Sequence, residues 1–167
     1  IQLFLSKDES STRNKAASSL RRIGRPHLAI ELASYEISKS RLNYYARVIR
    51  GSAYNDIGAF DEAIEDGEIA LKYSLPDKKY YPLIVLARAK TGNCKKYGLI
   101  SDGEESVVYA LRALQNNESI YTAKIFISAV RTVGAEEHEA LISHLERKYL
   151  FPERKPDPVA AEIATSV

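Results

Sequence analysis

Glycine recurs at a nearly constant spacing along this chain, and this recurrence restricts the fold more than any other feature. Gly24, Gly58, Gly98 and Gly134 follow one another at intervals of 34, 40 and 36 residues. Each stands between two stretches whose apolar residues recur with the period of an α-helix. Glycine readily adopts the left-handed backbone conformation that ends a helix, so each one marks a turn between two helices. The pattern therefore predicts four helical hairpins in a tandem array.

The expected helices are the stretches on either side of these glycines. The first helices of the hairpins are expected at residues 11–23, 41–57, 82–97 and 119–133, and the second helices at residues 26–37, 61–73, 103–116 and 136–149. Pro26 and Pro82 suit a first helical turn, where the missing N–H costs no hydrogen bond. Asp61 is expected to cap a second helix, and Ser101 with Glu104 has the spacing of a capping box. The extra residues of the longest interval are expected in a loop before Pro82.

The length of 167 residues allows one domain with a continuous core. We expect a leader at residues 1–9, extended or partly helical, a repeat domain at residues 10–149 and a proline-containing tail at residues 150–167. The repeats within the domain are expected at residues 10–38, 40–76, 80–117 and 119–149. The chain starts at Ile1 and contains no methionine, so we expect either a segment of a longer protein or a sequence that lacks modified methionines.

Charge and cysteine content bear on where the protein works. The net charge of +2 gives no strong attraction to nucleic acid or to an anionic membrane, so an electrostatic argument depends on where the charges lie. Cys94 is the single cysteine, which excludes an internal disulfide and fits a reducing compartment. No apolar run approaches the roughly 18 residues of a membrane-spanning helix. A cytoplasmic protein with no membrane partner is expected.

The second predicted hairpin carries the motif that indicates a family. Residues 51–76 resemble a tetratricopeptide repeat, whose pattern runs L-G-x2-Y, then A, then an aromatic residue, then P. The matching residues are Gly51, Tyr54, Gly58, Phe60, Ala63, Ala70 and Pro76. Arg50 replaces the leucine of the pattern, Gly67 replaces an aromatic residue, and the tryptophan is absent. The resemblance extends more faintly over residues 10–149, and it implies an all-α fold, a right-handed α-solenoid of about four antiparallel helix pairs.

The residue types that carry catalysis or hold metals form no recognisable motif. His27, His138 and His144 are separated in the chain and lack the spacing of metal ligands. Cys94 takes the place that Tyr54 has in the second hairpin, so we expect a buried packing thiol and not a nucleophile. The string TGNCKKYG lacks the final Gly-Lys-Ser/Thr of a phosphate loop. We therefore expect no enzyme activity, no cofactor and no metal site.

In tetratricopeptide domains the first helix of each hairpin lines a concave groove, and the resemblance implies which side chains face it here. The expected groove residues are Asn14, Arg21, Arg22, Tyr45, Asn55, Asp56, Arg88, Lys95, Lys96, Tyr121, Lys124 and Arg131, together with Ser18, Val48, Ser52 and Ser128. Seven of them are cations and Asp56 is the one acid. The outer side is expected to carry acids of the second helices, among them Glu31, Glu62, Glu65, Asp66 and Glu68. A concave surface of one sign attracts a ligand of the opposite sign.

The expected function is protein–protein interaction. We expect a scaffold module, part of a larger protein or complex, that binds an extended acidic partner segment in the basic groove. The clamp with which some tetratricopeptide domains hold chaperone tails is absent, because Asn14, Ser18 and Ile49 occupy its positions. Two alternatives stay open. The groove could bind nucleic acid, with Tyr45 and Tyr121 stacking on unpaired bases, or the array could self-associate as a homo-oligomeric scaffold.

Overall fold

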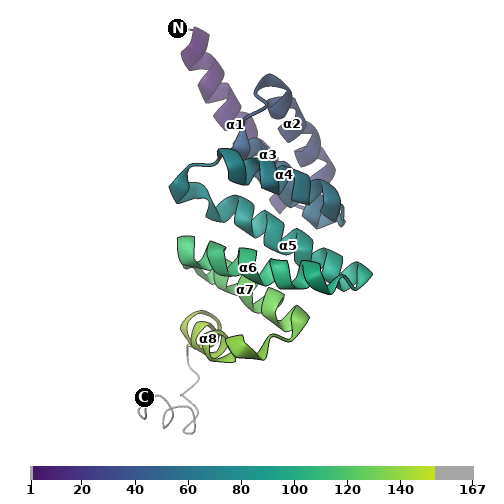
Figure 1. Ribbon diagram of the computed structural model, residues 1–167. Helices are drawn as coiled ribbons and strands as arrows, with labels where there is room; N and C mark the ends of the chain where they lie inside the picture. The colour runs from purple at the N-terminus through teal and green to yellow at the C-terminus, as the bar shows by residue number, and fades with distance from the viewer. Residues whose placement is uncertain (1, 153–167) are drawn as a thin grey trace. The chain divides into compact units, whose positions relative to one another are not determined.

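The computed structural model describes residues 2–152, with side chains from residue 9 onward, and it consists of helices joined by short turns (Figure 1). No strand occurs among the described residues. The chain divides into two compact units, residues 1–134 and residues 135–167. The described part of the first unit contains α1 (Gln2–Arg22), α2 (Pro26–Lys39), α3 (Tyr44–Ile57), α4 (Phe60–Tyr73), a 3-10 helix (Pro76–Lys78), α5 (Tyr80–Tyr97), α6 (Ile100–Asn116) and α7 (Ile120–Val133). The described part of the second unit contains a 3-10 helix (Glu136–His138), α8 (Glu139–Leu145) and a π-helical turn (Glu146–Leu150).

The all-α prediction is confirmed, with two differences at the ends of the chain. Helix α1 begins at Gln2, so the described part of the expected leader is helical. The stretch expected as one helix at residues 136–149 is helical throughout, but a 3-10 turn, a short α-helix and a π-helical turn follow one another in place of one regular α-helix. The N–H of His138 closes a tight turn on the carbonyl of Ala135 at 3.2 Å, whereas the N–H of Phe151 reaches back five residues to Glu146 at 2.7 Å. Residues 153–167 of the expected tail lie outside the described residues.

The four glycines turn the chain as predicted. Gly24, Gly58, Gly98 and Gly134 have φ angles of 76°, 76°, 70° and 69°, which lie in the left-handed region. The residue after the glycine then bonds back to the helix: the N–H of Ala59 donates to the carbonyl of Tyr54 at 3.0 Å. An L side chain at such a position is strained, so glycine allows each hairpin to close in a short turn.

The predicted caps are wrong, because α4 and α6 begin before the residues chosen. Ala59 is the N-cap of α4, which places Asp61 inside the first turn, where its charge favours the positive end of the helix dipole. Helix α6 begins at Ile100, directly after the turn at Gly98, so Ser101 also lies inside the helix. A capping box forms at α7 instead. There the N–H of Ser119 donates to Oγ1 of Thr122 at 2.9 Å, and the N–H of Thr122 donates to Oγ of Ser119 at 3.3 Å.

Consecutive helices pack on one another throughout residues 2–134. Each helix from α1 to α6 contacts the next one in the chain, and the first helices of successive hairpins also contact each other, α1 with α3, α3 with α5 and α5 with α7. Figure 1 shows α4, α5 and α6 lying one beside another in chain order. This neighbour-to-neighbour packing is the arrangement of a helical-hairpin repeat array, in which each unit buries its apolar face against the adjacent units.

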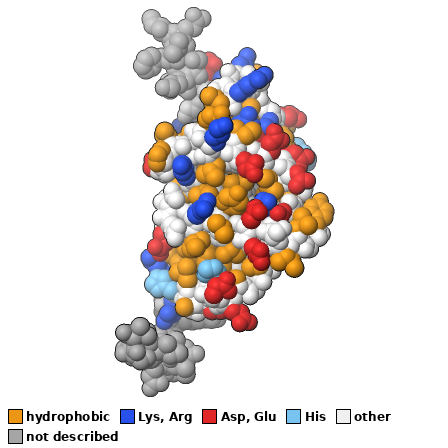
Figure 2. Space-filling view, in the orientation of Figure 1, with side chains coloured by type: hydrophobic (Ala, Val, Ile, Leu, Met, Phe, Trp, Pro, Cys, Tyr) orange, Lys and Arg blue, Asp and Glu red, His pale blue; other side chains and the backbone are white. Residues whose placement is uncertain are grey.

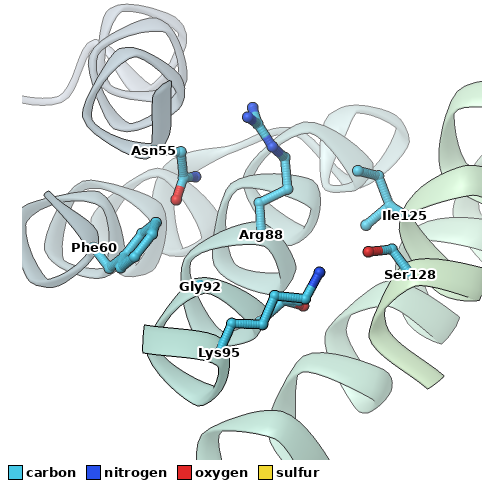
Figure 3. A pocket seen from close by; sticks show the side chains of 8 residues that line it. Asn55, Phe60, Arg88, Gly92, Lys95, Ile125 and Ser128 are labelled. Atoms are coloured by element: carbon cyan, nitrogen blue, oxygen red, sulfur yellow. The ribbon is translucent and has the colours of Figure 1, made fainter. Parts of the chain in front are cut away.

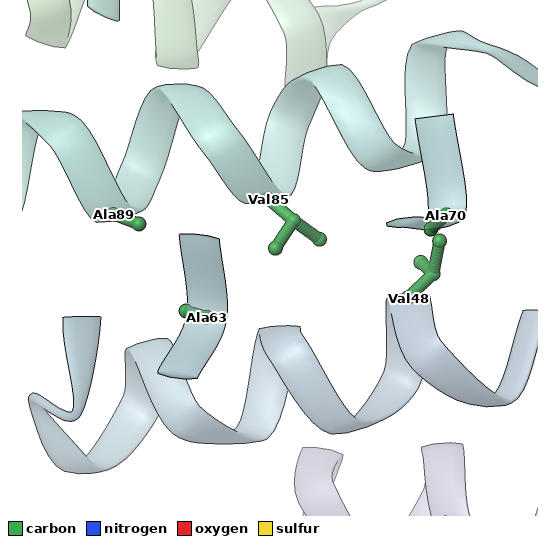
Figure 4. Packing of buried hydrophobic residues seen from close by; sticks show 5 residues of the cluster. All are labelled: Val48, Ala63, Ala70, Val85 and Ala89. Carbon is green, nitrogen blue, oxygen red and sulfur yellow. The ribbon is translucent and has the colours of Figure 1, made fainter. Parts of the chain in front are cut away.

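Small residues let the helices approach closely. One core cluster joins Val48 of α3, Ala63 and Ala70 of α4, and Val85 and Ala89 of α5 (Figure 4). Gly51 lies beside this cluster, and a Cβ there would be 2.9 Å from Cγ1 of Val85 and 3.3 Å from the carbonyl oxygen of Ala63. These positions are the ones where the motif places small residues, and their close contact explains why.

An ion pair joins the two helices of each of the first three hairpins. Arg13 of α1 pairs with the buried carboxylate of Glu36 on α2. Asp66 of α4 is 1 % exposed and accepts hydrogen bonds from Arg47 and Arg50 of α3. Lys90 of α5 pairs with Asp102 and Glu105 of α6 at 2.9 and 3.0 Å. Arg50, which departs from the repeat motif, is therefore the partner of a buried acid.

Candidate functional site

Three hollows lie against the first helices of the hairpins in the unit of residues 1–134. The tyrosine hollow, of about 250 Å³, is lined by Ser18, Arg21, Arg22, Tyr45, Val48, Ile49, Ser52, Tyr81, Ile84 and Tyr121. The lysine hollow, of about 230 Å³, is lined by Asn55, Phe60, Arg88, Thr91, Gly92, Lys95, Ile125 and Ser128 (Figure 3). The asparagine hollow, of about 430 Å³, is lined by Ser10, Ser11, Asn14, Lys15, Asn43 and Tyr45. Apart from Asn43 and Phe60, these residues belong to α1, α3, α5 and α7, and we call their shared surface the first-helix face.

The lining residues follow the helical repeat. Three helices place one residue in the tyrosine hollow and another, seven positions later, in the lysine hollow. These pairs are Val48 and Asn55 on α3, Ile84 and Thr91 on α5, and Tyr121 and Ser128 on α7. Seven residues make about two helical turns, so both members of a pair lie on the same side of their helix. The two hollows are therefore successive parts of one helical face, repeated on three helices.

The tyrosine hollow has an apolar floor and an aromatic wall. Val48, Ile49 and Ile84 are buried, whereas Tyr45 and Tyr121 are 37 % and 48 % exposed. The rings of Tyr45 and Tyr81 meet edge to face with their centroids 6.3 Å apart, an arrangement that aromatic pairs prefer. Burial, together with the neighbouring Tyr81 and Tyr44, raises the pKa of Tyr45 and so disfavours ionisation of its hydroxyl.

The lysine hollow combines a cation with an unsatisfied acceptor. Asn55 is buried, and its Nδ2 donates to the carbonyl of Val85 at 3.0 Å. Its Oδ1 has no hydrogen-bond partner among the described residues, and Figure 3 shows this oxygen turned toward the space between Phe60 and Arg88. Lys95 and Ser128 are exposed and line the same hollow. This buried oxygen is therefore an acceptor that the described residues leave unsatisfied.

Asp56 neutralises part of the positive charge beside the hollows. Its carboxylate accepts from Arg21 of α1 at 3.1 Å and from Arg88 of α5 at 2.9 Å, so it bridges three consecutive first helices. The side chains of these three residues are 24–27 % exposed. The Arg21–Asp56–Arg88 group thus carries one net positive charge in place of the two that its arginines alone would contribute.

Eight of the twelve predicted groove residues line a hollow, and four do not. Those that line one are Asn14, Arg21, Arg22, Tyr45, Asn55, Arg88, Lys95 and Tyr121. Asp56, Lys96, Lys124 and Arg131 line none of the three. The amine of Lys96 lies instead over the rings of Phe60 and Tyr97, at 5.9 and 5.0 Å from their centroids. Asn14 is buried, contrary to an exposed groove position, because α1 packs on α2 and α3 around it.

Sequence reasoning missed several lining residues, Tyr81, Ile84 and Ile125 among them. The predicted helix began at Pro82, whereas α5 begins at Tyr80 and so includes Tyr81. Tyr81 and Ile84 precede Arg88 by seven and four residues, and Ile125 follows Tyr121 by four. Residues four or seven positions apart lie on one face of a helix, so this spacing could have identified the missed residues once the start of α5 was known.

One expected outer acid is also corrected. Asp66 was expected on the outer side, but it is buried against Arg47 and Arg50 because it lies on the side of α4 that meets α3. Glu31, Glu62, Glu65 and Glu68 are exposed. In the upper part of the face drawn in Figure 2, acidic side chains gather mostly on the right, whereas basic side chains lie at the top, on the left and between the acids.

Within the described residues, no group of three or more His, Cys, Asp or Glu side chains is placed to hold a metal ion. Cys94 is only partly buried, and its Sγ lies beside Gly103, where a Cβ would approach it to 2.8 Å. Among the described helices, none has both the length and the apolar character to cross a membrane.

Comparison with known proteins does not assign the chain. No protein-family model and no curated protein matches its sequence.

Proposed function

We propose that this chain is a tetratricopeptide-type interaction module whose first-helix face binds an extended, acidic segment of a partner protein. The module is a right-handed α-solenoid in this proposal and acts as part of a larger protein or complex. The proposal is based on the residues that line the hollows and on their spacing along the helices.

The repeat architecture is supported by turns and contacts that the motif requires. The left-handed glycines recur at the turns, the small residues Gly51, Ala63 and Ala70 are buried between paired helices, and consecutive helices from α1 to α7 pack on one another. An array of this kind presents the same side of successive helices on one surface. A ligand that contacts several first helices at once must then be extended or long.

The observation that carries the function is the repeated seven-residue register of the first-helix face. It brings aromatic, amide and cationic side chains of α3, α5 and α7 into neighbouring hollows. Interfaces are rich in tyrosine and arginine, because these residues supply a large contact area with few rotatable bonds or with directed hydrogen bonds. The face therefore has the composition of a protein-binding surface.

Charge favours an acidic partner. Within the described residues, no ion pair engages Arg22 or Lys95, which line the hollows, or Lys124 on α7. Arg21 and Arg88 together add one further net positive charge, because Asp56 neutralises one of the two. Carboxylates of a partner would find counter-charges there that the fold itself does not use.

Selection from a display library of random 12-residue peptides tests this function. The native protein is compared with Arg22→Glu/Lys95→Glu, which reverses two unpaired cations of the hollows. The matched control is Lys39→Glu/Lys72→Glu, which makes the same charge change on the second helices α2 and α4. We expect acidic peptides to be enriched, and we expect the groove variant to bind them at least tenfold more weakly while the control binds as the native protein does.

Two results would overturn this proposal. The first is the absence of any enriched peptide that binds the native protein, or equal binding by both charge-reversed variants. The second is tight, steeply salt-dependent binding of a single-stranded oligonucleotide that displaces the selected peptides, which would assign the face to nucleic acid.

A further inference from the structure

We propose that the tyrosine hollow and the lysine hollow together recognise a partner segment in which a large apolar residue and an acidic residue are three positions apart. This inference rests on the proposed function and defines the partner more narrowly. It combines the spacing of the hollows with the chemistry of each.

The spacing follows from the helical register. Lining residues of the two hollows are offset by seven positions on each of three helices, as with Val48 and Asn55 on α3. At about 1.5 Å per residue of helix, seven positions correspond to roughly 10 Å. An extended chain advances about 3.3–3.6 Å per residue, so it covers this offset in about three residues.

The tyrosine hollow suits the apolar residue. Its floor is formed by the buried side chains of Val48, Ile49 and Ile84, and partly exposed tyrosine rings form its wall. Its volume is about 250 Å³, and an apolar cavity of about 150 Å³ is large enough to hold benzene. A leucine or phenylalanine side chain of the partner would fill the hollow and remove the exposed part of Tyr121 from water, which is favourable in proportion to the apolar area buried.

The lysine hollow suits the acidic residue. Lys95 lines it and has no ion pair within the described residues, so a carboxylate can approach the amine without displacing another acid. The hydroxyl of Ser128, in the same hollow, can donate a second hydrogen bond. A neutral residue at this position of the partner segment would leave Lys95 without a counter-charge.

A peptide series of fixed composition tests the spacing. Fluorescein-labelled 12-residue peptides of glycine and serine carry one leucine and one glutamate, separated by one to six positions and in both orders. Their Kd values are measured by fluorescence anisotropy, beside a reference peptide with glutamates only. We expect the pair three positions apart, in one of the two orders, to bind at least fivefold more tightly than pairs one or six positions apart.

Two pairs of variants test which hollow binds the acidic residue and which binds the apolar residue. Lys95→Gln should abolish the preference for glutamate over glutamine in the peptide, whereas Lys96→Gln, a neighbouring lysine outside the hollows, should retain it. Tyr121→Ala should abolish the preference for leucine over serine, whereas Tyr97→Ala, at another exposed tyrosine, should retain it. Far-UV circular dichroism verifies that the four variants stay helical, and Tyr121→Gln, which keeps a long side chain with good helix propensity, replaces Tyr121→Ala if the latter unfolds.

The outcomes separate the two proposals. If acidic peptides bind equally at all spacings, or if each variant and its control behave alike, the two-hollow motif is refuted while the acidic-segment function stands. If neither the leucine–glutamate peptides nor the glutamate reference bind the native protein, the proposed function fails as well.

Discussion

Two aspartates with the same kind of partners but different burial allow a test of how ion pairs stabilise this array. Asp66 accepts from Arg47 and Arg50 at 2.7–2.9 Å and is almost fully buried. Asp56 accepts from Arg21 and Arg88 at 2.9–3.1 Å, but its side chain is 25 % exposed. Replacing each aspartate by asparagine keeps the side-chain volume and removes the charge.

The expected losses differ because solvent screens the two groups differently. Removing one partner of a buried ion pair costs about 3–5 kcal/mol, since the remaining charge stays buried without compensation. The side chains of Arg47 and Arg50 are 12 % and 21 % exposed, so water reaches them in part and we expect about 3 kcal/mol for Asp66→Asn. For Asp56→Asn we expect about 0–1 kcal/mol, the range of exposed ion pairs.

Urea denaturation at neutral pH, followed by far-UV circular dichroism, measures the free energy of unfolding of the native protein and both variants. A double-mutant cycle adds Arg50→Ala, which should cost less in the Asp66→Asn background than in the native protein, because the arginine has lost its partner there. Equal losses for Asp66→Asn and Asp56→Asn, or no coupling between Asp66 and Arg50, would refute the reasoning that burial decides the strength of these pairs.

Three further predictions follow from the turns, the close contacts and the pKa values. Gly58→Ala should lower the free energy of unfolding by about 1–2 kcal/mol, because φ is +76° there and an L side chain is strained. The control Ala59→Gly introduces no such strain and should not cause this loss. Urea denaturation measures both variants. Gly103→Ala should lower the free energy of unfolding by about 1–3 kcal/mol, because its Cβ would lie 2.4 Å from Cγ1 of Val133 and 2.8 Å from Sγ of Cys94. If Gly103→Ala destabilises the Cys94→Ala protein as much as the native protein, the contact with the thiol has no role in this loss. Burial opposes ionisation of Asp102, but hydrogen bonds from Lys90 and Asn93 more than offset it and lower its pKa. The pair should therefore stabilise the fold above about pH 3.9, the unfolded value, and lose this contribution as pH falls through the lowered pKa. Thermal denaturation across that range should show a shallower acid slope for Lys90→Met than for the native protein, and identical slopes would contradict the assignment.

Much of the fold was predictable because its signals are local. A glycine that ends a helix in the left-handed region depends on its own backbone, so Gly24, Gly58, Gly98 and Gly134 could be identified as turns from their spacing. The helical period on either side of each glycine depends on residues three and four positions apart. The last predicted helix differs from a regular α-helix because its hydrogen-bonding pattern changes from 3-10 to α to π along residues 136–150, a change that the apolar period does not reveal.

The candidate site was predictable only in part. The resemblance to tetratricopeptide repeats placed Arg88 and Lys95 on the groove side of their helix, and both line the lysine hollow. Tyr81 was missed because the start of α5 depends on the preceding 3-10 turn, Pro76–Lys78, and not on the motif. The unsatisfied Oδ1 of Asn55 has no sequence signal, since it arises when the amide turns its Nδ2 toward Val85, thirty residues later.

The sequence by itself determined the helical class, the number of turns and the positions where small residues bring helices together, because backbone conformation and side-chain size act over a few residues. Tertiary structure alone decided which charges face one another. It buried Asp66 against two arginines and used Asp56 to join α1, α3 and α5, while Lys95 was left at a hollow without an ion pair among the described residues. The physical reason is that an ion pair between helices depends on how far each helix is rotated and shifted against its neighbour. A rotation by a single residue, about 100°, is enough to turn a buried pair into two exposed charges.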